Sequence, residues 1–81
     1  MITLFHSKDI ESSIVASHAE LIGVDVRLVD KTSEVSFDNM VELIDERNMD
    51  YEVMDTSGPV LITDEDVFCG LEECVNGLDE I

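Results

Sequence analysis

The stretch SGPVLITDEDVFCG, residues 57–70, decides how this chain folds. The run PVLIT is apolar and β-branched and predicts a strand, and the acidic DED after it predicts a tight turn. VFC then predicts a second strand, antiparallel to the first. Gly70 separates this hairpin from a final helix whose inward positions are Leu71, Val75 and Leu78. We therefore expect a β-hairpin followed directly by a helix.

Two further strands and two helices are expected upstream of this hairpin. MITLF, at residues 1–5, predicts a buried strand, and Asp9 can cap the helix that follows it. Its inward side chains, at helical spacing, are expected to be Ile14, Val15, His18, Leu21 and Ile22. Gly23 is expected to end the helix. VDVRLVD, at residues 24–30, alternates Val24, Val26 and Leu28 with Asp25, Arg27 and Val29, which predicts a half-buried strand.

Residues 32–36 are polar, and Ser36 can cap the next helix. One stripe of this helix is apolar and consists of Phe37, Met40, Val41 and Ile44. Residues 48–58 are expected to be irregular. The resulting order is β-α-β-α-β-β-α in a single domain, residues 1–81, of the α/β class. Strands joined by a helix should be parallel, so we expect a four-stranded mixed sheet flanked by helices on both faces.

The charge of the chain restricts its partners. The sequence has 20 acidic and 4 basic residues and a formal net charge of −16. Direct nucleic-acid binding is not expected, because phosphate contacts depend on Lys and Arg. A charge-driven partner should be basic. No run approaches the about 20 apolar residues of a membrane helix, and no signal peptide is recognised, so we expect a cytoplasmic protein without membrane contact.

The element order and several local signatures resemble the glutaredoxin family of the thioredoxin fold, over nearly the whole chain. ITLF, at residues 2–5, and the following step to a helix resemble the family's first strand and CPxC turn. SGPVLITDEDVFCG resembles its TVP–strand–turn–strand–GG segment. The resemblance implies that Pro59 is a cis proline facing the active-site turn, that Gly70 is the second glycine of the pair, and that Glu72 and Glu73 lie near its acidic pair.

The sequence departs from the family pattern at the residues that carry the family's redox chemistry. The two CPxC cysteines align with Ile10 and Ser13, and Glu11 replaces the proline. Cys69 replaces the first glycine of the pair, and Gly58 replaces the valine before Pro59. Disulfide exchange needs a thiolate, and no base is apparent that would activate Ser13. We therefore expect a vestigial groove at Ile10, Ser13, Gly58 and Pro59, with no catalytic residues, no cofactor and no redox activity.

Other candidate sites are weaker. Cys69 and Cys74 could form a relocated redox pair, although structural thiols are the preferred interpretation, because nearby acids raise thiol pKa values. His6 and His18 have none of the spacings of zinc ligands, and His18 is expected to be packed and hydrogen-bonded. The DED turn lacks the glycine and distant glutamate of a calcium loop. No metal site is expected.

The positive functional signal is a pair of carboxylate rows on predicted helices. Residues four apart on a helix are about 6 Å apart. The first acidic row consists of Asp38, Glu42, Asp45 and Glu46, and the second acidic row consists of Glu72, Glu73, Asp79 and Glu80. Such rows resemble the charge spacing of a nucleic-acid strand and could compete for a basic groove.

We therefore predict a redox-inactive acidic binding protein, monomeric or weakly dimeric. Its partner would be a basic protein surface, for example a nucleic-acid-binding protein or polymerase, which it inhibits or modulates. A phage-encoded inhibitor of a host factor would suit this size and charge. Two alternatives stay open: a thiol-disulfide oxidoreductase that uses Cys69 and Cys74, and a salt-adapted domain whose charge has no specific partner.

Overall fold

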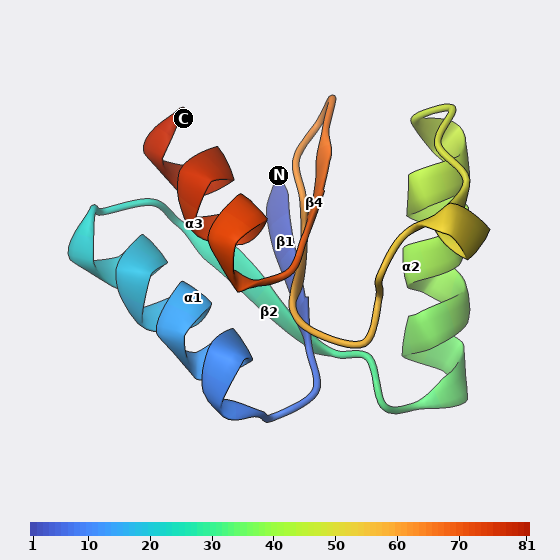
Figure 1. Ribbon diagram of the computed structural model, residues 1–81, viewed down its shortest axis with the longest axis horizontal. Helices are drawn as coiled ribbons and strands as arrows, with labels where there is room; N and C mark the ends of the chain where they lie inside the picture. Colours follow the sequence, from blue (N-terminus) through green and yellow to red (C-terminus); the bar gives the residue numbers. More distant parts are fainter.

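One mixed sheet with the strand order β2-β1-β3-β4 organises the computed structural model, which describes residues 1–81 (Figure 1). The elements along the chain are β1 (Ile2–His6), α1 (Ile10–Leu21), β2 (Val26–Asp30), α2 (Glu34–Glu46), the short 3-10 helix η1 (Tyr51–Val53), β3 (Val60–Ile62), β4 (Val67–Cys69) and α3 (Leu71–Asp79). None of these helices is long and apolar enough to cross a membrane.

The strand pairing confirms the predicted parallel pair and the predicted hairpin. β1 and β2 are parallel, with Leu4 opposite Leu28, because α1 carries the chain back between them. β3 is antiparallel to β1, and β3 and β4 form the hairpin, in which Leu61 lies opposite Phe68. At the hairpin turn, the Thr63 amide donates to the Asp66 carbonyl at 2.9 Å.

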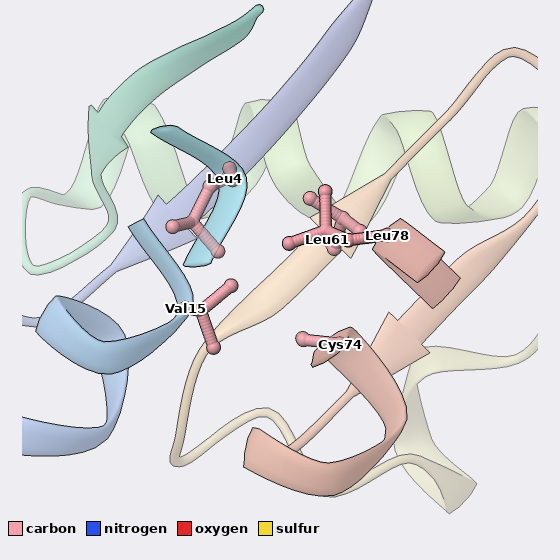
Figure 2. Packing of buried hydrophobic residues seen from close by; sticks show 6 residues of the cluster. Leu4, Val15, Leu61, Cys74 and Leu78 are labelled. Carbon is pink, nitrogen blue, oxygen red and sulfur yellow. The ribbon is translucent and has the colours of Figure 1, made fainter. Parts of the chain in front are cut away.

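Helices cover both faces of the sheet, as predicted: α1 and α3 lie on one face and α2 lies on the other (Figure 1). The alternation of side chains along the strands divides the core accordingly. The cluster under α1 and α3 consists of Leu4, Val15, Ala19, Leu61, Cys74 and Leu78 (Figure 2). The cluster under α2 consists of Phe5, Met40, Ile44, Val60, Ile62 and Val67.

The predicted inward face of α1 is confirmed at Val15 and wrong at Ile14, Leu21 and Ile22. The residues that α1 buries are Ser12, Val15 and Ala19, whereas Ile14, Leu21 and Ile22 are exposed. Helical spacing is satisfied by either set, and the small side chains of Ser12 and Ala19 let the helix lie close to the sheet. Leu28 is also exposed, because β2 is an edge strand.

The start of α2 also differs from the prediction. The N-cap is Ser33 and not Ser36, and the Ser33 hydroxyl accepts a hydrogen bond from the Ser36 amide at 3.2 Å. Either serine can supply the capping oxygen. The earlier start adds Glu34 to the first turn, where a carboxylate is favoured by the partial positive charge of the helix end.

Candidate functional site

The N-terminus of α1 is a capped helix end that carries no cysteine. The Asp9 carboxylate accepts a hydrogen bond from the Ser12 amide at 2.9 Å, as predicted for the cap. Hydrogen bonding from Ser12 lowers the pKa of the Asp9 carboxyl below its usual value. Ile10 is 80% exposed and, with Ser13, lines an open hollow on the outer side of the helix.

Gly58, directly before Pro59, lies next to the first turn of the same helix. A Cβ on Gly58 would lie 3.4 Å from Glu11 Oε1 and 4.0 Å from the Gly70 Cα, so the Glu11 carboxylate faces this turn. The structure therefore places Gly58 beside Glu11, while Ile10 and Ser13 line the outer hollow.

The peptide bond before Pro59 is trans, so the cis bond implied by the resemblance is wrong. The buried proline carbonyl accepts a hydrogen bond from the Gly70 amide at 2.9 Å. The trans form is the one that X–Pro bonds generally prefer. The turn is held from the other side by Lys31, a buried base that sequence reasoning missed, whose Nζ donates to the Ser57 carbonyl at 3.3 Å.

The two cysteines are free thiols in environments that oppose ionisation. Cys74 points into the core between α3 and the sheet (Figure 2), and burial raises the pKa of its thiol to about 12. Its Sγ lies 3.4 Å from the Phe68 carbonyl and 3.5 Å from the Pro59 carbonyl. Cys69 ends β4 half-buried, and burial, with Glu73, raises its pKa above the ordinary value.

The histidines occupy separate places. His18 Nε2 lies 2.7 Å from the Asp79 carboxylate and links α1 to α3, so the predicted packed, hydrogen-bonded role is confirmed. His6 is partly buried at the end of β1. No three His, Cys, Asp or Glu side chains are arranged so that they could hold a metal ion.

Both acidic rows are exposed, on opposite faces of the molecule. The first acidic row lies on α2 and the second lies on α3 and its C-cap Glu80, and all eight carboxylates are exposed. Because α2 and α3 cover opposite faces of the sheet (Figure 1), a rigid partner cannot contact both rows through one flat surface.

Most of these carboxylates have no ionic partner. In the first row, Glu46 lies 3.9 Å from Arg47, and in the second row Asp79 pairs with His18. The row residues without an ion pair are Asp38, Glu42, Asp45, Glu72, Glu73 and Glu80.

The chain's few bases are used elsewhere. Arg47 donates to the carbonyls of Thr63 and Leu43 at 2.8 Å and 2.7 Å, and Lys8 pairs with Asp30 at 3.5 Å. Arg27 lines a hollow that also contains Asp38 and Glu42, so the first row has a base nearby. Lys8, Lys31 and Arg47 are thus held in local contacts. No Lys or Arg pairs with a carboxylate of the second row, which is therefore the less neutralised of the two rows.

Comparison of the chain with family models, curated proteins and solved structures found no match.

An apolar stripe on the outer face of α1 is the feature that sequence reasoning missed. We call Ile10, Ile14 and Leu21 the α1 stripe; their exposed fractions are 80%, 46% and 84%. The signal was present in their spacing of four and seven residues, which places them on one helix face. On sequence alone, Ile14 and Leu21 are expected in the core with Val15, and Ile10 is expected in the vestigial groove.

Proposed function

We propose that this chain is a glutaredoxin-like domain of the thioredoxin fold that has lost its redox chemistry and binds a basic protein surface through its carboxylates. A nucleic-acid-binding protein or polymerase, inhibited or modulated by occupation of its basic groove, is the kind of partner that this charge suits. The observation that carries the proposal is the set of six row carboxylates that are exposed and lack an ion pair.

Physical chemistry supports a charge-driven interaction. Excess charge of one sign steers an oppositely charged partner and accelerates encounter, more strongly at low salt. No second-row carboxylate is paired with Lys or Arg, and the row's one basic contact is that of His18 with Asp79. The field of the other three carboxylates extends into solvent over about a Debye length, about 8 Å at physiological ionic strength.

The arrangement around α1 supports the loss of disulfide exchange. Ile10 and Ser13 replace the sulfur that the reaction needs, and the remaining thiols, Cys69 and Cys74, have raised pKa values. The sheet order β2-β1-β3-β4 with helices on both faces is compatible with the glutaredoxin-like assignment.

Charge reversal of each row tests the proposal. One variant carries Lys at all four positions of the first acidic row, and the other carries Lys at all four positions of the second. Binding to immobilised histones is measured between 50 and 500 mM salt for the two variants and the unaltered chain. We expect at least one reversal to weaken binding about tenfold or more and to flatten its salt dependence. Unchanged affinity in both variants would refute a charge-steered interface.

Salt adaptation is the second candidate, because acids are exposed on turns as well as on the rows. Asp50, Glu52 and the residues 64–66 are exposed outside the three α-helices. A chain whose charge only serves a salty environment should fold cooperatively in molar salt and lose its structure in dilute buffer, since self-repulsion is unscreened there. Circular dichroism at 10 mM and 2 M salt separates the two: the binding protein folds in both.

A further inference from the structure

The α1 stripe is the largest concentration of exposed apolar side chains on one element. Its three members lie on one side of α1, and Ile22 follows directly after the helix and is also exposed. α2 exposes one large apolar residue, Val35, and α3 exposes none within its bounds. The stripe runs about 16 Å along the helix, at 1.5 Å per residue.

The shape of this face suits a second helix. Ser13 and Ser17 are four residues apart and have small side chains beside the row made by Ile10 and Ile14. Together with Lys8 and Asp9, these residues line an open hollow of ≈ 390 Å³. Ridges of large side chains separated by grooves of small ones are how helices pack against each other.

The charges beside the stripe are acidic. Glu11 and Glu20 are exposed on α1, and α3, which carries the second acidic row, is joined to α1 by the contact of His18 with Asp79. The nearby base, Lys8, is paired with Asp30 at 3.5 Å. An apolar centre with a charged rim is the usual composition of a protein interface, and this rim is complementary to Lys and Arg.

We propose that the α1 stripe, together with Glu20 and the side of α3 that contacts α1 through Asp79, docks a basic amphipathic helix of the partner. The partner's apolar side covers the α1 stripe, and its Lys and Arg side chains reach the carboxylates of the rim. This inference rests on the proposed function and selects the α1–α3 face over the α2 face. A second copy of the chain is the disfavoured occupant, because two chains of net charge −16 repel each other.

The test uses two synthetic 18-residue peptides of identical Leu and Lys composition. One places its leucines on a single helix face, and the other has a scrambled order. Dissociation constants are measured by fluorescence anisotropy in 150 mM salt for the unaltered chain, for Ile14→Asp and for the matched control Val35→Asp. Both substitutions add one negative charge at an exposed site, so neither is expected to unfold the chain, and urea titration checks this.

We expect the amphipathic peptide to bind at least tenfold more tightly than the scrambled one. Ile14→Asp should weaken it at least fivefold despite the added charge, whereas Val35→Asp should change it less than twofold. A second variant, Ile10→Ser, should weaken it without any change of charge. Equal binding of the two peptides, with Ile14→Asp neutral or tighter, would overturn the α1 docking face while leaving the charge-driven function intact.

Two other outcomes also overturn the inference. Failure of both peptides to bind would refute both the docking face and the proposed function. Light scattering that shows a dimer, abolished by Ile14→Asp, would instead make this face a contact between two copies of the chain.

Discussion

Thiol reactivity gives the sharpest test of the missing redox chemistry, and its size follows from the surroundings of Cys74. In the Cys69→Ala variant, Cys74 is the only thiol of the chain. At pH 8, a thiol with a pKa of about 12 is thiolate in about one molecule in 10⁴, against about one in eleven at the ordinary value of 9.0. Because the thiolate is the nucleophile, Cys74 should react with Ellman's reagent about a thousandfold more slowly in the folded chain than in 6 M urea.

The complementary variant, Cys74→Ala, reports on Cys69. Its pKa is raised by burial and by Glu73 and Asp55, so it should also react more slowly than an unfolded thiol, by a smaller factor than Cys74. A Cys69 that reacts faster than free cysteine would refute the reasoning, since it would mean a stabilised thiolate of the kind that a redox enzyme needs.

The same shift predicts a pH dependence of stability. The folded-state pKa of Cys74 is raised, so its contribution is complete below the unfolded value of about 9 and is lost as pH rises towards about 12. The Cys69→Ala variant should therefore lose more stability between pH 8 and pH 10.5 than a variant lacking both cysteines. Urea midpoints at the two pH values check this, and parallel losses would contradict it.

Two predictions concern the scaffold. Leu78→Ala removes a fully buried side chain and should cost about 2–5 kcal/mol in urea unfolding, whereas Leu21→Ala, at an exposed position, should change stability by less than about 0.5 kcal/mol. Asp9→Ala removes the cap of α1 and should cost about 0.5–2 kcal/mol, measured against Asp25→Ala, which removes the same charge outside the helices. The pKa of Asp9 is lowered when folded, so this cost should vanish as pH falls below that folded value.

The parallel pair and the hairpin were predictable because each segment carries its own local signal, whereas the pairing of β1 with β3 joins strands far apart in sequence. The hairpin at residues 60–69 depends on neighbours in sequence, and the parallel pairing of β1 with β2 follows from the helix between them. The inward face of α1 was not predictable in the same way. Periodicity offers two apolar faces, one through Val15 and Ala19 and one through Ile14 and Leu21, and only packing against the sheet chooses between them.

The candidate site, too, could be predicted from the sequence only in part. Exposure of the two acidic rows follows from helical spacing, since charged side chains avoid the core. The use of Lys31 and Arg47 to hold backbone carbonyls depends on loops that meet only in the folded chain. The sequence therefore predicts that the surface is acidic, and the fold determines which carboxylates stay unpaired.

If the proposed charge-driven binding occurs, the placement of the acidic rows on opposite faces would make the domain divalent. A partner bound at the α1–α3 face leaves the four carboxylates of α2 open to solvent, so a second basic molecule can attach to the same chain. With a polybasic protein that also offers several sites, such cross-links extend into networks. Mixtures near charge balance should then become turbid, and Lys substitution of the α2 carboxylates should restore a clear solution of one-to-one complexes.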